Sequence, residues 1–350
     1  MDTLNKKSEL LAYLALGVLL VVILPLWLDP YRLNLVSKYL ALAFVAIGIV
    51  LMWGYGGILS LGQGVFFGIG GYLMAMFLKL EASAPELPDF MVWSSVETLP
   101  TWWIPFQSFT NTVLAIFTIP GVLAFGFSYA IFKKRVSGVY FAIVTLSLAL
   151  TMSVLIVGQQ GDTGGFNGIT NFSTLLGMDI LEDESKTWLY FIQLGFLFVV
   201  MLLASLIVRT RYGKVLIAIR DKEDRVRFSG YDTAMMKACI FTIAAVFASI
   251  GGAMYTLQVG LIAPSVVGVM ASVEMVIYAA VGGRLSVPGA VVGALLIGYS
   301  RSYLSETFPE SWLFFLGMVF ILVVLVMPNG LSGVAGQLLE RYRPVRRLAK

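Results

Sequence analysis

The sequence of 350 residues contains no histidine and a single cysteine, Cys239. The absence of histidine excludes His-based acid–base catalysis, Ser-His triads and most zinc sites. One cysteine cannot form an intrachain disulfide or a metal cluster. No Gly-x-x-x-x-Gly-Lys-Ser/Thr string occurs, so the chain has no nucleotide-binding P-loop of its own. We therefore expect no enzyme activity, no metal and no cofactor in this chain, and any energy source must come from a partner or an ion gradient.

Charge is also scarce, because charged residues make up 13% of the chain while an ordinary soluble domain carries roughly 25%. A transmembrane helix needs about 20 apolar residues. The sequence therefore predicts one all-α, polytopic integral membrane domain over residues 1–350, with about ten transmembrane helices. The candidate spans are apolar runs bounded by polar or charged residues, at 10–28, 35–52, 65–80, 111–131, 136–157, 188–208, 238–257, 266–283, 287–304 and 311–327.

The charges in the loops predict the orientation, since Lys and Arg accumulate on the cytoplasmic side of a membrane. Segment 81–110 has four acids and no basic residue, and segment 158–187 has five acids against one lysine, so both read as external. The basic segments 133–135, 209–237 and 337–350 read as cytoplasmic. Ten spans place all five segments on their expected sides, with both termini cytoplasmic. This bias accounts for the net charge of +4, so we expect no nucleic-acid binding.

The cytoplasmic connection 209–237 has the pattern of a short amphipathic helix rather than of a linker. Val215, Ile219 and Val226 recur at roughly helical spacing, and Gly230 marks the end of the helix. One interpretation is a helix that lies on the lipid headgroups. The other is a helix that docks on a cytoplasmic partner through its apolar face.

Charge favours docking over lipid binding. Asp221/Arg225 and Glu223/Arg227 are opposite charges four residues apart, which support a helix. A pure lipid binder would not place acids against an acidic leaflet. The charged residues expected to take part in docking are Arg220, Asp221, Glu223, Asp224, Arg225 and Arg227.

Seven short motifs stand in fixed order along the chain: Trp53–Phe67, Leu87–Met91, Gly138–Ala142, Asn167–Thr170, Gln258–Pro264, Val281–Arg284 and Pro309–Leu313. Together with the segment 218–232, this set resembles the permeases of branched-chain-amino-acid-type ABC importers, and most closely their urea-transporter subfamily. The segment 218–232 looks like the coupling loop of these permeases. Two positions depart from the family pattern: Gln63 stands where a histidine is usual, and the turn 284–288 replaces a Gly-Thr-rich one.

The resemblance implies a multi-pass permease subunit that carries urea across the bacterial inner membrane. It further implies a second homologous permease, two cytoplasmic ATP-binding subunits, a periplasmic substrate-binding protein and membrane lipids as partners. Transport of branched-chain amino acids or short-chain amides by the same kind of importer is the first alternative. A channel or secondary transporter without ATPase is the second, and it leaves the charged 213–230 segment unexplained.

Four glycines, Gly57, Gly62, Gly64 and Gly68, mark either close helix packing or a substrate path. In the second interpretation, the turn 54–64 unwinds at membrane depth and lines a cavity with backbone groups.

Glu274 is the one carboxylate clearly inside an apolar run, so it should face the bundle interior and find a hydrogen-bond donor. A structural role and a role in permeation both remain open for it. Urea would need hydroxyl, amide and carbonyl partners rather than fixed charge. The residues expected to line its path together are Tyr140, Thr145, Ser147, Glu274 and Tyr278.

Overall fold

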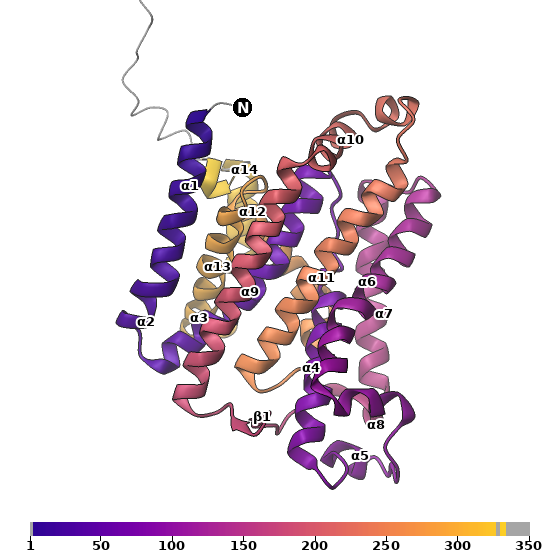
Figure 1. Cartoon of the computed structure of the whole chain (residues 1–350), viewed down its shortest axis with the longest axis vertical. Coiled ribbons are helices and arrows are strands. Elements are labelled where there is room, and N and C mark those ends of the chain that lie inside the picture. Colours follow the sequence, from indigo (N-terminus) through magenta and orange to yellow (C-terminus); the bar gives the residue numbers. More distant parts are fainter. Residues whose placement is uncertain (1–2, 327–329, 334–350) are drawn as a thin grey trace, which may run out of the picture.

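The computed structural model describes residues 3–326 and 330–333, which are almost entirely helical (Figure 1). The basic segment 337–350 and its expected cytoplasmic end lie outside the described residues. The longer helices are α1 (Thr3–Val18), α3 (Pro30–Ile49), α4 (Gln63–Ser83), α6 (Phe109–Lys133), α7 (Val139–Gly158), α9 (Asp183–Arg209), α10 (Arg211–Phe228), α11 (Thr233–Val259), α12 (Val269–Gly282), α13 (Val287–Thr307) and α14 (Trp312–Val326). The short elements are α2 (Leu24–Trp27), α5 (Asp89–Trp93), α8 (Gln160–Thr163) and the antiparallel pair β1 (Thr174–Leu175) and β2 (Met178–Asp179).

Each predicted span falls on a helix, but not every helix is long enough to cross a bilayer. Among the described residues, six helical segments have the length and apolar composition of a membrane span. They are Pro30–Tyr55, which is α3 with a π-helical end, and α4, α6, α7, α9 and α11. Helix α12 has 14 residues and a length of about 21 Å, less than the roughly 30 Å of a hydrocarbon core. The ten-span topology therefore remains a prediction.

The loops gather at the two ends of the bundle according to their charge (Figure 1). Helices α5 and α8 and strand β1, which belong to the two acidic segments, lie at one end. Helix α10 and the turn between α6 and α7, which carry basic residues, lie at the opposite end. This arrangement agrees with the predicted alternation of external and cytoplasmic loops.

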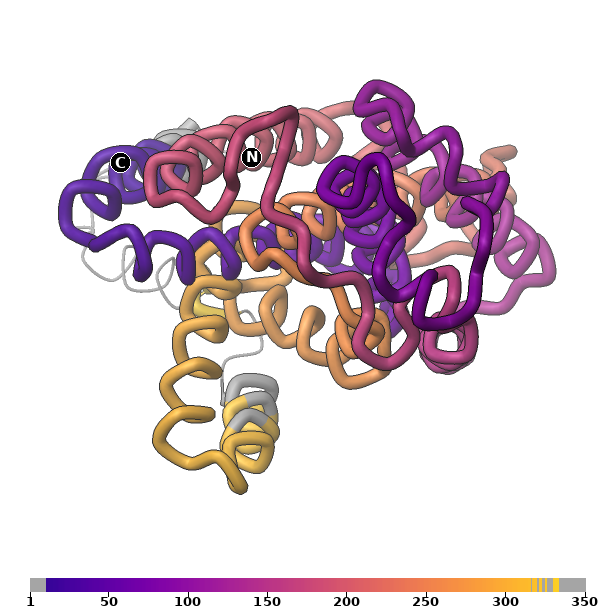
Figure 2. Tube along the Cα trace, turned by 90° about the horizontal axis from the view of Figure 1, so that it is seen from below, coloured from indigo at the N-terminus to yellow at the C-terminus, as the bar shows by residue number. Residues whose placement is uncertain are grey.

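Helix α11 lies at the centre of the bundle, where it packs against α3, α4 and α6. The closest approaches use glycine: a β carbon on Gly252 would lie 1.8 Å from the carbonyl oxygen of Phe67. By contrast, α6, α7 and α9 keep many large apolar side chains exposed. Helices α13 and α14 extend as a pair away from the main body (Figure 2). The core thus lies around α11, and the surrounding helices present apolar surface outward.

Candidate functional site

The chain leaves helical geometry between the end of α3 and the start of α4. The π-helical turn Val50–Tyr55 is followed by the non-helical segment 56–62, and α4 begins at Gln63. Gly57 has φ +68°, a left-handed conformation that suits glycine. Non-helical backbone inside a membrane bundle is tolerated where protein or a cavity supplies partners for its polar groups. Residues 56–62 are non-helical, as the second interpretation of the glycines expects, while a cavity lined by this turn stays a prediction.

Hydroxyl groups accept hydrogen bonds from backbone amides at the end of this segment and at the start of α4. Thr145 Oγ1 on α7 accepts a hydrogen bond of 3.0 Å from the amide of Leu61. Ser272 Oγ on α12 accepts one of 3.1 Å from the amide of Gly64. The amide of Gly62 donates to Ser60 Oγ at 3.3 Å. Helices α4, α7 and α12 therefore meet at a buried polar centre, which we call the mid-bundle centre and define as Ser60, Gln63, Thr145 and Ser272.

Gln63 adds an unpaired acceptor to the mid-bundle centre. Its side chain is 1% exposed, and its Nε2 donates to Met52 Sδ at 3.3 Å. Its Oε1 is buried and has no hydrogen-bond partner among the described residues. A buried amide oxygen without a donor is unfavourable, so this atom is suited to accept an N–H group from a bound molecule.

The predicted glycines lie where helices approach one another closely. A β carbon on Gly62 would lie 2.3 Å from the carbonyl oxygen of Thr145, and one on Gly64 would lie 2.5 Å from Ser272 Oγ. On Gly68 it would lie 2.2 Å from a methyl group of Val267. Close packing thus accounts for these three positions, while their role in lining a substrate path stays a prediction.

Arg220 of α10 reaches the non-helical segment directly. Its Nη1 donates a hydrogen bond of 2.6 Å to the carbonyl oxygen of Gly54, and its Nε lies 3.1 Å from Asp221 Oδ1. A β carbon on Gly57 would lie 2.7 Å from Arg220 Cγ, so the arginine stem lies against this turn. Tyr55 Oη also donates to the carbonyl oxygen of Leu285, at 2.7 Å. The end of α3 therefore contacts both α10 and the turn between α12 and α13.

The expected use of the apolar face of α10 is wrong in one respect. Leu216 and Ile219 are buried within this chain, so Ile219 cannot anchor the helix in a partner. The backbone is also kinked at Lys222, with φ −153° and ψ 81°. This kink disrupts the helical spacing, and Asp221 pairs with Arg220 instead of Arg225. The predicted pair Glu223/Arg227 is formed, with 2.9 Å between Glu223 Oε1 and Arg227 Nη2.

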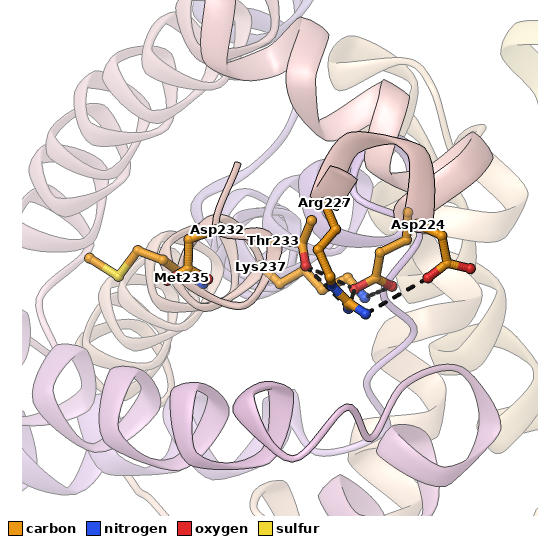
Figure 3. Close-up of polar contacts among 7 residues, drawn as sticks. Asp224, Arg227, Asp232, Thr233, Met235 and Lys237 are labelled. Atoms are coloured by element: carbon orange, nitrogen blue, oxygen red, sulfur yellow. Dashed lines mark hydrogen bonds and ion pairs between the residues drawn. The ribbon is translucent and has the colours of Figure 1, made fainter. Parts of the chain in front are cut away.

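Glu223 joins the end of α10 to α11 through contacts with Thr233 and Lys237 of α11. Figure 3 labels both of these residues together with Arg227, which also pairs with Glu223. Lys237 of α11 donates to Glu223 Oε2, and Thr233 Oγ1 donates to Glu223 Oε1 at 3.1 Å. Partial burial raises the pKa of the Glu223 carboxyl, but the hydrogen bond and charge of Lys237, together with Thr233 and Arg227, outweigh it and lower the pKa overall. Glu223 therefore stays ionised at neutral pH and serves a structural contact.

The surface of α10 that stays free for a partner is charged and carries one aromatic ring. Asp221, Asp224 and Arg225 are exposed, and Phe228 is 92% exposed. Exposed aromatic rings of this kind are common anchors in protein interfaces. Of the six charged residues predicted for docking, Glu223 and Arg227 hold α10 to α11, Arg220 contacts the segment 56–62, and the other three face outward.

Glu274 finds its donors on α12 and α13. It is 7% exposed, and Arg301 Nη1 lies 3.0 Å from its Oε1 and 2.8 Å from its Oε2. Tyr278 Oη donates to Oε1 at 2.7 Å. The Arg301 guanidinium also lies over the Trp312 ring, 5.3 Å from its centroid. Sequence analysis missed Arg301, although it is the one basic residue in the run 287–304.

The five residues expected to line one path do not form one cluster. Tyr140 is 75% exposed on α7, and Ser147 is exposed and donates to the carbonyl of its own helix. Residues 140 and 147 are two helical turns apart and share a face, whereas residue 145 lies on the other side. Thr145 therefore joins the mid-bundle centre, Glu274 and Tyr278 form their own pair, and Tyr140 and Ser147 face outward.

The buried cation Lys79 joins α4 to the two acidic segments 81–110 and 158–187. Lys79 is 4% exposed, and its Nζ lies 2.7 Å from Asp89 Oδ1 and 3.2 Å from the carbonyl oxygen of Asn171. Partial burial raises the pKa of Asp89, but hydrogen bonds from Lys79 and Asn171 lower it overall. Lys79 thus links α4 to both acidic segments. The sequence does not predict this role, because Lys79 lies inside the apolar run 65–80 and its partners lie in distant loops.

Comparison with known proteins identifies the family. The model for "Branched-chain amino acid transport system / permease component" matches residues 31–324. The chain belongs to this permease family. The permease is 23% identical to the high-affinity branched-chain amino acid transport system permease protein LivM of Escherichia coli (strain K12), over 94% of its own length and 76% of the relative. It is 25% identical to LivH of Salmonella typhimurium, over 83% and 91% of the two chains. It is 22% identical to BraD of Pseudomonas aeruginosa, over the same shares.

No solved structure matches the permease. The family and the apolar helices make it an integral membrane protein and a transport component rather than an enzyme. Relatives named for branched-chain amino acids support the alternative substrate class of the sequence analysis better than urea.

Proposed function

We propose that this permease is the transmembrane subunit of an ATP-driven importer for branched-chain amino acids in the bacterial inner membrane. Its partners are two cytoplasmic ATPase subunits, a periplasmic binding protein and a second permease. The observation that carries the proposal is the family match over residues 31–324, together with relatives that are named for this transport. Urea remains the competing substrate, supported by the motifs of the sequence.

The contact between Arg220 and Gly54 could transmit movement of α10 to the mid-bundle centre. ATPase subunits that bind the exposed face of α10 would act on Arg220 through Asp221, which is exposed and pairs with Arg220 before the kink at Lys222. Arg220 holds the carbonyl of Gly54, two residues before the non-helical segment. That segment ends at the close contact between Gly62 and Thr145. Movement of α10 would therefore open or close the packing at the mid-bundle centre.

The mid-bundle centre also has chemistry that suits an amino acid. The unpaired Gln63 Oε1 can accept an N–H of the substrate ammonium group. Gln63 is the first residue of α4, and the N-terminal end of a helix favours negative charge. Broken helices in other transporters use their ends in this way. An amino acid carries both groups, whereas urea carries no charge.

Uptake in cells tests the proposal. In a strain that lacks this gene, uptake of labelled leucine and of labelled urea is measured with and without a plasmid copy, and after ATP depletion or dissipation of the proton gradient. We expect the plasmid to restore leucine uptake that depends on ATP and survives loss of the gradient. Restored uptake of urea alone would favour the competing substrate, and uptake that follows the gradient would reject the ATP-driven importer.

A further inference from the structure

A cavity of about 240 Å³ opens where the basic ends of α6 and α10 meet the start of α11. Three cations line it: Lys133 and Arg135 at the end of α6, and Arg227 on α10. Tyr129 and Tyr231 form part of its wall. Ligand sites for drug-sized molecules usually measure roughly 300–1,000 Å³. This cavity therefore suits a smaller group, of the size of a phosphate with its ester carbons.

The charges around the cavity do not balance. Lys133 lies over the Tyr129 ring, 5.3 Å from its centroid, and among the described residues neither Lys133 nor Arg135 pairs with a carboxylate. Arg227 is already paired with Glu223. Asp232 also lines the cavity, but its Oδ1 accepts a hydrogen bond from the amide of Met235. The lining thus has three cations against the Asp232 carboxylate, which a hydrogen bond from an amide does not neutralise, and two of these cations, Lys133 and Arg135, have no carboxylate partner among the described residues.

The cavity lies at the end of α6, and the same helix carries exposed apolar side chains further along its length. Lys133 is the last residue of this helix, which has the length and composition of a membrane span. Val122 is 71% exposed on the same helix, and Leu123 is 49% exposed. An anion that carries acyl chains could therefore place its chains along α6 and its charged group among the cations. A free anion would gain nothing from this neighbouring surface.

We propose that the cavity binds the phosphate group of an anionic phospholipid, with Lys133 and Arg135 as the principal contacts. This site lies apart from the mid-bundle centre and does not depend on which substrate the permease carries. The lipid would hold the end of α6 against α10, because Arg227 lines the same cavity and is fixed to Glu223. The basic turn 133–135 would then bind a specific lipid, in addition to carrying the positive charge that predicts the orientation of the chain in the membrane.

The test compares two double variants with equal loss of charge. Lys133→Gln with Arg135→Gln removes two lining cations, whereas Lys134→Gln with Lys214→Gln removes two exposed cations that do not line the cavity. The full-length permease is reconstituted in nanodiscs of phosphatidylcholine with a minority of phosphatidylglycerol, and the phospholipid retained after extraction is measured by native mass spectrometry. We expect the first variant to retain phosphatidylglycerol at least fivefold less than the wild type, and the control to retain it normally.

Three results would overturn the proposal. The first is equal retention of phosphatidylglycerol by both variants. The second is displacement of the lipid by inorganic phosphate at millimolar concentration, which would assign the site to a free anion. The third is normal lipid retention by the first variant combined with a lower recovery of ATPase subunits when they are co-purified with it in detergent, which would make the cavity a protein contact. Thermal melting of each variant in detergent shows that a lost lipid is not the result of misfolding.

Discussion

Arg220 Nη1 donates a hydrogen bond of 2.6 Å to the carbonyl oxygen of Gly54, a residue 166 positions earlier in the chain. This bond joins α10, which lies at the basic end of the bundle, to the last turn before the non-helical segment 56–62. An arginine that seemed suited to a partner surface thus contacts the transport bundle itself. We therefore expect substitutions of Arg220 and Arg225 to have different effects on transport and on ATPase binding.

Loss of Arg220 should uncouple transport without releasing the ATPase. In Arg220→Gln we expect normal recovery of ATPase subunits with the permease, but an uptake rate about tenfold lower, since a charged hydrogen bond contributes roughly 1.5–3 kcal/mol. The matched control is Arg225→Gln, which makes the same change at an exposed position. It should lower ATPase recovery instead. If Arg220→Gln lowers recovery as much as Arg225→Gln does, then Arg220 acts at the interface and the route through Gly54 is wrong.

Alanine at Gly57 should disturb the same contact from the other side. A side chain at φ +68° costs about 1–2 kcal/mol, and its β carbon would lie 2.7 Å from Arg220 Cγ. We expect Gly57→Ala to lower both the melting temperature and uptake. Gly126→Ala is the control, because a β carbon there meets nothing within 4 Å. Equal melting curves and equal uptake for both variants would show that the turn is not constrained in this way.

The pair Glu274 and Arg301 should behave as one unit in stability. Arg301→Gln leaves a buried carboxylate without its cation and should cost roughly 1–3 kcal/mol, because the Arg301 side chain is itself 44% exposed; the loss is measured as a lower unfolding midpoint in detergent. The double variant Glu274→Gln with Arg301→Gln removes both charges and should recover most of this loss. Normal uptake by the double variant would assign the pair a structural role, whereas low uptake at normal stability would place it on the substrate path. Equal destabilisation of single and double variants would contradict the pairing.

Cysteine labelling should separate the two ends of the bundle. In a Cys239→Ala background, cysteines at Ser95 and Met178 should react with an impermeant thiol reagent in intact cells, because both residues are exposed at the acidic end. A cysteine at Ser229, next to the end of α10, should react after the membrane is opened. Reaction of the Ser229 variant in intact cells would reverse the orientation that the loop charges predict.

The sequence predicts much of the helical framework, because apolar runs in a bilayer have few alternatives to a helix. The glycines of residues 54–64 allow two interpretations, close helix packing and an unwound turn, so the sequence offers the non-helical segment after Tyr55 as one of two alternatives. The sequence does not reveal the kink at Lys222, since nothing in the local pattern distinguishes that residue from its neighbours. Nor does it pair Glu274 with Arg301 or Lys79 with Asp89, because contacts between helices depend on their rotation. The separation of Tyr140 from Thr145 could have been predicted, since it follows from helical spacing alone.

The most direct test of this account is transport by the purified assembly in proteoliposomes. The permease, its ATPase subunits and a second permease are reconstituted together, the binding protein is added outside, and accumulation of labelled leucine and labelled urea is followed with ATP or a non-hydrolysable analogue inside. We expect leucine to accumulate when ATP is inside the vesicles and not when the analogue is inside. We expect Arg220→Gln to suppress this accumulation while ATPase subunits stay bound. Accumulation of leucine without ATP hydrolysis, or of urea in its place, would contradict it.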